Sequence, residues 1–584
     1  MKLSVTPDLS STRRLLLTSL CIAGAISVLF ALKLDVRSHL GDTDDAMRLV
    51  MVRDLLAGHG WYDQWISRLN PPAGLYMHWS RLVDGGIASL ITILRLAAPP
   101  VTAEWLARVI WPLLWIFPAV ASALWLARNL GARSAVLTTA VLLMIDLESY
   151  RQFLPGRIDH HNIQIVMTIL ALAAATSPRR PIACAVIAGA ASAIGLAVGL
   201  EGLIVQAIIG ASWAIRLAFD RRQAAAAAAY GATLALGAAG LFLIQTPPGR
   251  WALPVCDALA VNLVSALVIS GVGICLVAAL ASRLPSSVRW AGLGVVGAFA
   301  AGAYIALEPS CLHGPFAAVE PLARKLWLDR VEEIQPLPVV FRLDRAAAVD
   351  GLAIMATTLA AALYLLARKS TRTPPTALAV LAFLVSCALA ARYWRTMDYV
   401  AWIGIPLMGV ALSRIAASKL RDFFVPTLAI SILVSPMNVA VAANSAEKAL
   451  TPPPSHSWVQ PSERCFAPAA YRQLASLPPG TVMSEIDTGS FILAFTPHSA
   501  LIAPYHRISH EVVLTLQAFG APVDASEAKV RALGATYIVD CRDLSLAARP
   551  GTLGAQLRSG PAPAWLQPLS PPGATLSIWR VAAS

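Results

Sequence analysis

Long apolar runs dominate the hydrophobic pattern of this chain and predict a protein that crosses a membrane many times. A helix needs about 20 mostly apolar residues to span the hydrocarbon core of a bilayer. Thirteen runs approach or reach this length, near residues 14–33, 105–127, 134–147, 163–176, 182–199, 202–218, 224–245, 259–281, 290–307, 348–366, 375–391, 399–417 and 423–443. The pattern therefore predicts a polytopic α-helical membrane protein with about 13 transmembrane helices.

Short basic clusters between the runs predict how the helices are oriented. Loops with such clusters alternate with loops that lack them, and they fall on the side of Arg13 and Arg14, at 128–133, 177–181, 220–222, 282–289, 367–372 and 418–422. By the positive-inside rule this side is the cytoplasm. Nearly all the Asp, Glu and His fall on the opposite side, in 34–104, 148–162, 246–258, 308–347, 392–398 and everything after about 444.

Two features of the N-terminal part bear on this topology. The first apolar run follows basic residues and has no small-residue cleavage site after it, so we expect a retained anchor and not a cleaved signal peptide. The apolar stretch 87–98 would invert all later loops if it were counted as a span. We therefore expect it to form an interfacial helix in the first outside loop.

Composition agrees with a membrane protein. The 584 residues are 57% hydrophobic and 14% charged, with a mean hydropathy of +0.64, whereas a soluble globular chain is roughly a quarter charged. The net charge of +13 does not indicate nucleic-acid binding, because the basic residues form short clusters between apolar runs and not one polar face. Arg outnumbers Lys and Ala is common, which suggests a GC-rich bacterial genome, so we expect the inner membrane, with the outside being the periplasm.

The last part of the chain changes character. After the Pro-rich segment at 451–458, short strand-like runs alternate with helical ones, so we expect a membrane domain at 1–444 and a small soluble periplasmic α/β domain at 445–584. Cys465 and Cys541 both lie in this part, and an oxidising compartment would permit a disulfide without deciding whether one forms. The other six cysteines lie mostly inside apolar runs, where they are expected to act as small hydrophobic side chains.

Three outside segments concentrate ionisable groups next to the predicted membrane surface. They read GDTDDAMR (41–48), LPGRIDHHNIQ (154–164) and LDRVEEIQPL (328–337). Carboxylates and imidazoles are ligands for divalent cations such as Mn²⁺ or Mg²⁺. A cation could therefore hold these distant loops around one site, through some of Asp42, Asp44, Asp45, Asp159, His160, His161, Glu332 and Glu333.

Structural roles are open for each segment taken alone. Charges beside a span often fix its end in the headgroup region, and the Asp-His-His run could cap the following helix. The two glutamates of the third segment could pair with Arg324, Lys325 or Arg330. The shared predicted side of all three segments favours one external polar site.

The sequences of the three segments resemble motifs of the catalytic subunit of oligosaccharyltransferase. Asp42 to Arg48 is similar to a D-x-x-x-x-x-R segment in the first external loop of that family, and GRIDHH is similar to its archaeal G-x-x-D-H-H segment. RVEEIQP resembles the eukaryotic S-V-S-E-H-Q-P, which aligns the family glutamate with Glu333. The resemblance implies the GT-C fold of membrane glycosyltransferases, with a C-terminal soluble α/β periplasmic domain.

The resemblance also implies roles for individual residues. Asp42 would bind the metal and the acceptor, and Asp159, His161 and Glu333 would complete the metal site. Asp44 and Asp45 are further candidates for catalysis and acceptor contact. The implied cofactor is a divalent cation, Mn²⁺ or Mg²⁺.

Two arginines outside a later span, Arg392 and Arg395, match the place where the family grips the donor phosphate. A guanidinium offers a planar fork to phosphate oxygens, although an arginine that snorkels at a span end is the alternative. In the first loop, Arg81 is a third candidate for the phosphate. Candidates for acceptor or sugar contact are Arg48, His78, Trp79, His160, Tyr505 and His506.

The reaction implied is transfer of a sugar or glycan from a polyprenyl-phosphate or polyprenyl-pyrophosphate donor to an acceptor at the outer membrane face. Its partners would be this lipid-linked donor, membrane lipid, and a glycan, lipid or protein acceptor. The family motif W-W-D-Y-G is missing, since no Trp-Trp pair occurs in the chain. This puts asparagine-linked protein glycosylation in doubt and favours a bacterial relative that modifies a cell-envelope glycan, lipid or polymer.

A transporter or flippase for a lipid-linked or anionic substrate is the alternative from another functional class. Transport predicts ionisable residues near the middle of spans. Here Glu201 falls in a short turn, and Asp146 and Glu148 fall at a predicted span end. The span interiors are otherwise almost free of charge, which favours the enzyme.

Overall fold

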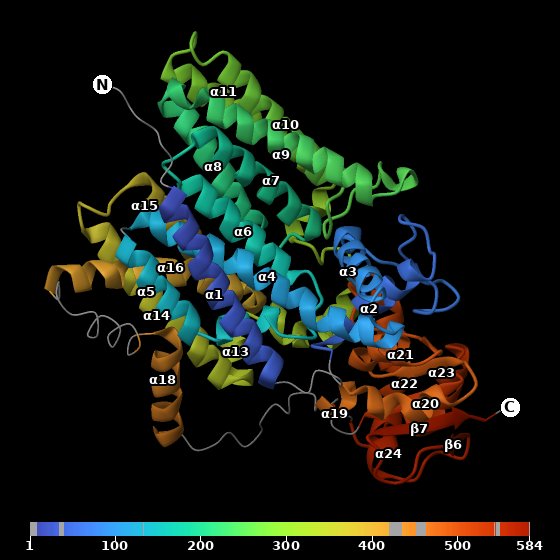
Figure 1. Ribbon diagram of the computed structural model, residues 1–584. Coiled ribbons are helices and arrows are strands. Elements are labelled where there is room, and N and C mark those ends of the chain that lie inside the picture. The colour runs from blue at the N-terminus through green and yellow to red at the C-terminus, as the bar shows by residue number, and fades with distance from the viewer. Residues whose placement is uncertain are drawn as a thin grey trace.

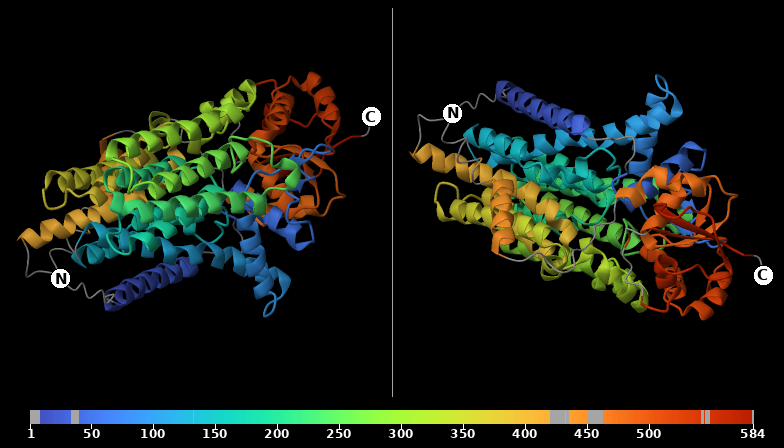
Figure 2. Two further views of the ribbon diagram at one scale, coloured as in Figure 1. Left: turned by 90° about the horizontal axis from the view of Figure 1, so that it is seen from above. Right: turned by 90° about the horizontal axis from the view of Figure 1, so that it is seen from below.

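A bundle of long helices with a small sheet at one end makes up the protein in the computed structural model (Figures 1 and 2). The structure describes residues 9–33, 40–131, 133–419, 432, 435–450, 463–541, 544 and 549–582. Among these residues, nine helices are long and apolar enough to cross a membrane. They are α1 (Leu9–Lys33), α4 (Pro100–Leu130), α7 (Pro181–Val198), α9 (Ala224–Gln245), α10 (Val261–Ala279), α11 (Ser286–Leu307), α14 (Arg345–Ala367), α15 (Pro374–Arg392) and α16 (Met397–Lys419).

Three further apolar runs form shorter helices, which are α5 (Arg133–Ile145), α6 (His161–Thr176) and α8 (Leu203–Phe219). Twelve of the thirteen predicted spans thus coincide with helices. The thirteenth, at 423–443, lies largely outside the described residues, although α18 (Pro436–Leu450) begins within it. The polytopic helical fold predicted from the sequence is confirmed.

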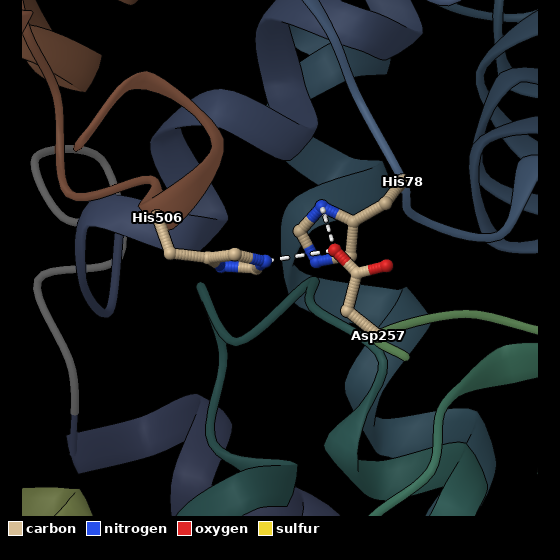
Figure 3. Close-up of side chains that lie close together, drawn as sticks. All are labelled: His78, Asp257 and His506. Carbon is tan, nitrogen blue, oxygen red and sulfur yellow. Dashed lines mark hydrogen bonds and ion pairs between the residues drawn. The ribbon is translucent and has the colours of Figure 1, made fainter. Parts of the chain in front are cut away.

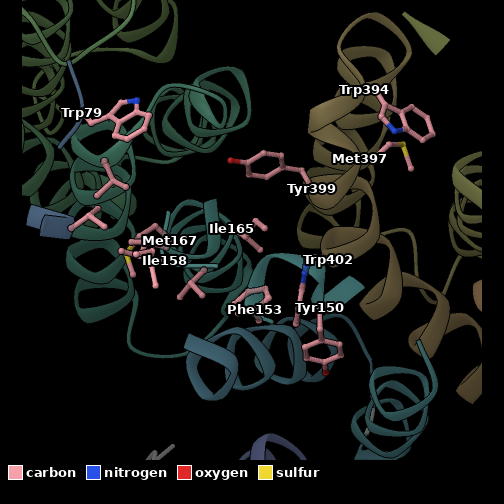
Figure 4. Packing of buried hydrophobic residues seen from close by; sticks show 14 of the residues in the cluster. Trp79, Tyr150, Phe153, Ile158, Ile165, Met167, Trp394, Met397, Tyr399 and Trp402 are labelled. Atoms are coloured by element: carbon pink, nitrogen blue, oxygen red, sulfur yellow. The ribbon is translucent and has the colours of Figure 1, made fainter. Parts of the chain in front are cut away.

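Helices α6 and α16 are buried along almost their whole length, and Figure 4 shows side chains of both, among them Ile165 and Met167 of α6 and Tyr399 and Trp402 of α16, in one buried apolar cluster. Almost every side chain of α6 is buried, as expected of a helix that is apolar all round. The 3-10 helix η1 (Glu148–Phe153) anchors the segment that leads into α6, because Tyr150 and Phe153 pack against Trp402 of α16. The Trp402 indole also donates to the backbone oxygen of Ser149 at 2.9 Å. The segment 154–160 is therefore held between two buried elements.

The loop between α1 and α4, called the first external loop because the charge pattern assigns it to the outside, contains helices α2 (Thr43–Leu56) and α3 (Arg81–Leu94), joined by the hairpin of β1 (Trp65–Ile66) and β2 (Leu75–Tyr76). Helix α3 overlaps the stretch for which the sequence predicts an interfacial helix. Both helices lie at the end of the bundle that also carries the C-terminal sheet (Figures 1 and 2). Between α11 and α14 the chain forms α12 (Pro321–Leu326), the 3-10 helix η6 (Glu332–Ile334) and α13 (Leu337–Leu343).

The C-terminal part is a small mixed α/β unit, in agreement with the sequence. Its five strands have the order β4-β3-β5-β7-β6, with β3 parallel to β4 and β5, and β7 antiparallel to β5 and β6. All five residues of β5 are buried. The strands are β3 (Thr481–Ser484), β4 (Ser499–Ala500), β5 (Tyr537–Cys541), β6 (Leu566–Pro568) and β7 (Leu576–Val581), and the helices are α19 (Glu463–Phe466), α20 (Arg472–Ala475), α21 (Gly489–Phe495), α22 (Ser509–Phe519), α23 (Val523–Ala532) and α24 (Leu553–Ser559).

The first external loop extends the edge of this sheet. The backbone N–H of Asn70 donates to Ala500 at 2.8 Å, and the N–H of Ala500 donates to Arg68 at 2.9 Å. The Arg68 guanidinium adds hydrogen bonds to the backbone oxygens of Leu493, Thr496 and His498. These bonds satisfy edge groups of the sheet and fix the first loop against the C-terminal unit.

Two disulfides stabilise the segments outside the spans. Cys465 and Cys541, whose pairing the sequence leaves open, form a disulfide, and a second bond joins Cys256 to Cys311. Cys256 and Cys311 lie outside the apolar runs, whereas the four cysteines inside such runs, Cys21, Cys184, Cys275 and Cys387, are free. All four bonded cysteines fall in segments that the charge pattern assigns to the outside, where an oxidising compartment preserves disulfides.

A buried carboxyl group predicts how the stability of the C-terminal unit depends on pH. Glu485 and Asp540 both contact the Arg558 guanidinium. Burial and the charge of Asp540 raise the pKa of Glu485 from 4.5 to about 9. A raised pKa in the folded state means that the stabilisation is complete below pH 4.5 and is lost as the pH rises through about 9.

We therefore expect the thermal unfolding temperature of the full chain in detergent to fall between pH 5 and pH 9, and to fall less for Glu485→Gln. Exposed Glu527→Gln is the matched control, since Glu527 makes only a surface pair with Arg531. Parallel pH curves for all three proteins would contradict this assignment.

Candidate active site

The first acidic segment forms the N-terminus of helix α2. The Asp42 Oδ1 atom accepts hydrogen bonds from the backbone N–H groups of Asp44 and Asp45, at 2.9 and 3.0 Å, and so caps the helix. The Asp42 Oδ2 atom contacts the Arg157 guanidinium of the second segment. The cap thus fixes the direction of Asp42, and the ion pair joins the first segment to the second.

Asp45 has a structural role, which corrects the expectation that it contacts an acceptor. Its carboxylate is fully buried and accepts from the Arg157 guanidinium at 2.9 Å. It also accepts from the backbone N–H groups of Asp42, Ile158 and Asp159. Because these four donors surround it, Asp45 cannot reach a substrate and instead holds the second segment against α2.

A buried ion-pair network positions Asp159. The Arg48 guanidinium donates to Asp159 Oδ1 at 3.0 Å and to Asp84 Oδ1 at 2.8 Å, and it stacks on the Trp79 ring with 4.4 Å to the ring centroid. On its other side, Asp159 Oδ1 lies 2.6 Å from His160 Nδ1. Arg48 is fully buried, so the predicted acceptor contact by Arg48 does not fit its position. Its role is to hold Asp159.

A second chain of polar contacts starts at His161, the first residue of α6. Its Nε2 atom lies 3.2 Å from Asp159 Oδ2, and its Nδ1 atom lies 3.0 Å from Glu201 Oε2. The Arg395 guanidinium forms an ion pair with Glu201 and lies 3.2 Å from His161 Nε2. This chain connects the second segment, the turn between α7 and α8, and the start of α16.

Neighbouring positive charges lower the pKa values of several carboxyl groups around the site. Burial would raise the pKa of Asp42, but the Arg157 guanidinium outweighs it and the pKa is lowered. Likewise, contact with His160, His161 and Arg48 outweighs burial and holds the pKa of Asp159 well below its usual range. In Glu201 the Arg395 guanidinium outweighs burial and lowers the pKa to about 2. These carboxylates are therefore anionic at neutral pH.

Asp44 has the opposite character. Burial, together with the charges of Asp159, Asp42 and Glu333, raises its pKa well above the usual range. Among the described residues its carboxylate has no hydrogen-bond partner, and it lines the large cavity. It is thus the carboxyl group of α2 that is free to meet a substrate.

A cavity of about 2140 Å³ adjoins these groups. This volume exceeds the roughly 300–1,000 Å³ of a typical small-molecule pocket. Charged side chains occupy part of the wall, and apolar side chains from α7, α8, α9, the loop before α10 and α15 occupy another part. The predicted residues on this wall are Asp42, Asp44, His78, Trp79, His160, Glu333, Arg395, Tyr505 and His506.

The site fits a divalent cation by the chemistry of its donors. Asp159 Oδ2 is buried without a hydrogen-bond partner, and the imidazole Nε2 of His161 points to it from 3.2 Å. A carboxylate oxygen and an imidazole nitrogen that converge in this way form the start of a metal ligand set. Asp42 influences the same carboxylate electrostatically, and Glu333 lines the adjoining cavity.

Two predicted phosphate ligands lie away from the cavity, which corrects the expectation for each. Arg81 is buried, and its guanidinium is occupied by Asp84 and by the backbone oxygens of Trp61 and Asp63. Arg392 is exposed at the end of α15. Neither lines the cavity, so Arg395 is the predicted arginine that fits the donor.

The residues predicted to contact the acceptor divide into two groups. Trp79 lies against Tyr505, with 5.5 Å between the ring centroids, and the Tyr505 hydroxyl donates to the backbone oxygen of Thr43 at 3.4 Å. These residues lie beside the start of α2. His78 and His506, by contrast, meet at Asp257 (Figure 3), and thus form a separate cluster on the cavity wall.

Three residues of these clusters escaped the sequence analysis as site residues. Glu201 lies in the four-residue turn between α7 and α8, and an acidic residue in so short a turn is a usable signal. Arg157 is part of the GRIDHH motif, but the sequence analysis did not identify it individually as a site residue. Asp257 follows Cys256 in a loop without other acidic residues, and nothing in the local pattern distinguishes it.

Comparison with known proteins identifies the fold of this chain. No protein-family model and no curated protein match the chain. The archaeal oligosaccharyltransferase AglB from Archaeoglobus fulgidus, solved with an inhibitory peptide and a dolichol-phosphate, is similar with a TM-score of 0.65 and 15% identity over 97% of this chain and 74% of that one. The A. fulgidus enzyme solved with Zn and sulfate has a TM-score of 0.59 and 15% identity, over 97% and 73%. At this identity the likeness establishes the fold alone, and the chain has the same fold as this oligosaccharyltransferase.

Proposed function

We propose that this protein transfers a sugar or glycan from a polyprenyl-phosphate or polyprenyl-pyrophosphate donor to an acceptor at the outer face of the membrane. The observation that best supports this proposal is the convergence of three distant segments on one cavity. Asp42 and Asp44, the group around Asp159, and Glu333 meet there with Arg395. The GT-C fold supports the reaction class, since the similar A. fulgidus enzyme is an oligosaccharyltransferase that was solved with a dolichol-phosphate.

The donor fits the two kinds of wall. Apolar side chains of α7, α8, α9 and the loop before α10 would accept the polyprenyl chain, and Arg395 would bind the phosphate with its planar fork. Glu201 and His161 hold the Arg395 guanidinium in place. A lipid-linked donor also suits the outer face, where nucleotide sugars are scarce.

The acceptor would approach from the side of α2. Its nucleophile attacks the anomeric carbon, the bond from that carbon to the phosphate oxygen breaks, and the lipid phosphate leaves. We assign the ionised form of Asp44 as the base that receives the proton of the nucleophile, because it lines the cavity and lacks other described partners, and because its raised pKa makes that form a stronger base than an ordinary carboxylate. Trp79 and Tyr505 would pack against the acceptor or the transferred sugar.

The proposed divalent cation, Mn²⁺ or Mg²⁺, would be held by Asp42, Asp159, His161 and Glu333. When bound, it would supply positive charge for the leaving phosphate. The similar A. fulgidus enzyme was solved in complex with Zn, which supports metal binding by a protein of this fold. Neighbouring residues would orient the metal ligands, since Arg48 and His160 hold the Asp159 carboxylate in place.

We assign the sheet end of the bundle to the periplasm of a bacterial inner membrane. The charge pattern of the loops supports this orientation, and both disulfides lie in the segments that it places outside. The acceptor is then a periplasmic glycan, lipid or protein.

A pair of neighbouring arginines tests the donor assignment. We expect Arg395→Lys to raise the KM for the lipid-linked donor by roughly 10- to 100-fold, because the two-pronged bond to phosphate is lost. Arg392→Lys should change KM less than twofold, because Arg392 is exposed away from the cavity. Equal KM values for both variants, measured with purified proteins and a polyprenyl-phosphate sugar, would refute the role of Arg395.

A further inference from the structure

A second cluster of metal-ligand side chains lies on the cavity wall, apart from the group around Asp159. His78 from the first external loop, Asp257 from the loop after α9 and His506 from the C-terminal unit point toward one another (Figure 3). One ligand atom of each lies within 4.8 Å of the other two. All three side chains are largely buried, with exposed fractions of 13%, 9% and 12%.

We propose that these three residues bind a Zn²⁺-class transition-metal ion that fastens the C-terminal unit to the membrane part. Two imidazoles and one carboxylate are a common ligand set for zinc. The ligands come from three segments that are far apart in the sequence, so one ion would cross-link them. This site is independent of the transfer reaction proposed above.

The distances suit such an ion after a small adjustment. His506 Nε2 lies 2.7 Å and His78 Nδ1 lies 3.9 Å from Asp257 Oδ2. Zinc bonds of about 2.0–2.1 Å at tetrahedral angles place ligand atoms about 3.3 Å apart. A shift of about 0.6 Å in each imidazole reaches this spacing. Among the described residues, the imidazole nitrogens of His78 have no hydrogen-bond partner that would oppose the shift.

The surroundings already orient the carboxylate. Arg507 donates to Asp257 Oδ2 through Nε at 2.8 Å and to Oδ1 through Nη2 at 2.7 Å. Outer-shell partners of this kind set the direction of metal ligands. The disulfide of Cys256 with Cys311 fixes the loop directly beside Asp257. Three protein ligands leave a fourth position that faces the cavity, and the positive charge of Arg507 favours an anionic oxygen there.

The test measures bound metal with Zn²⁺ alone as the probe. Purified full-length protein is stripped with chelator, dialysed against Zn²⁺ and analysed by mass spectrometry, in an Asp159→Asn background that impairs the other candidate site. We expect one Zn²⁺ per chain in this background and less than 0.2 after addition of His506→Gln or His78→Gln. His59→Gln is the matched control, since His59 is an exposed histidine of the same external loop, and it should retain the ion.

A second measurement guards against variants that fold poorly. Addition of Zn²⁺ should raise the thermal unfolding temperature of the Asp159→Asn protein and leave that of the His506→Gln double variant unchanged. The proposal is overturned if the Asp159→Asn background binds no Zn²⁺, or if the His78 and His506 substitutions leave the bound Zn²⁺ unchanged. Loss of glycosyl transfer alone would bear on the proposed function and not on this site.

Discussion

Asp42→Asn is expected to lower the rate of glycosyl transfer by about 10²- to 10³-fold, because a carboxylate that would hold the divalent cation beside the leaving phosphate is lost. The protein should remain folded. Asn caps a helix as well as Asp does, so the bonds of residue 42 to the N-terminus of α2 can persist, and Arg157 keeps Asp45 as its partner. The measurement is the steady-state rate with a polyprenyl-linked sugar, combined with thermal unfolding.

The matched control for this variant is Asp63→Asn. Asp63 lies in the same external loop, but it is exposed and does not line the cavity. Transfer by the Asp63 variant should stay within twofold of the wild type. A similar rate for the two variants would remove Asp42 from the site.

Arg48→Leu is expected to destabilise the fold by about 3–5 kcal/mol, since it leaves two buried carboxylates without their cation. Asp84 and Asp159 have 0% and 2% of their side chains exposed, and both contact the Arg48 guanidinium. Arg81 still contacts Asp84, and His160 still contacts Asp159, but neither replaces the bridge between them. Thermal or denaturant unfolding in detergent measures the loss.

Arg392→Leu serves as the comparison for Arg48→Leu, because it removes the same charge from an exposed position. A surface change of this kind usually stays within about 0.5 kcal/mol. If both variants unfolded at the same temperature, the buried network around Arg48 would not carry the stability that its geometry indicates.

The membrane fold could be predicted from the sequence because its signal is long and redundant. Each span needs many consecutive apolar residues, so twelve of the thirteen predicted runs coincide with helices despite errors at their ends. The runs that form α5, α6 and α8 were harder, because their helices are shorter than a bilayer is thick. Irregular backbone is tolerated at their ends where protein encloses it.

The meeting of the three polar segments could be predicted only as a consequence of topology. Their common side followed from the basic loops, and the structure places Asp42, Asp44, Glu333 and Arg395 on one cavity wall, with Asp159 directly behind it. The roles of the individual residues in these segments could not be predicted from topology. Asp45 differs from Asp44 by one position, yet the turn of the helix buries one carboxylate and leaves the other at the cavity.

Contacts between distant segments could not be predicted from the sequence. Arg48 looked like an acceptor contact because it ends a polar motif, but its partner Asp84 is 36 residues away. Glu201 was noted as a turn residue, although alternation of the loops places that turn on the outer side. The bond of Cys256 to Cys311 and the cluster at Asp257 likewise depend on how separate loops pack, for which local patterns carry no signal.

The most direct test of the proposed active site is release of polyprenyl phosphate from a polyprenyl-linked sugar by the purified protein. Lipid products are measured with Mn²⁺ and an acceptor extract from the cell envelope. Wild-type protein should release the lipid phosphate, whereas Asp42→Asn and Asp159→Asn should release at least 100-fold less at about the same folded fraction. Equal release by the wild type and both variants, or no release by wild-type protein that binds the donor, would contradict a glycosyl-transfer site at these residues.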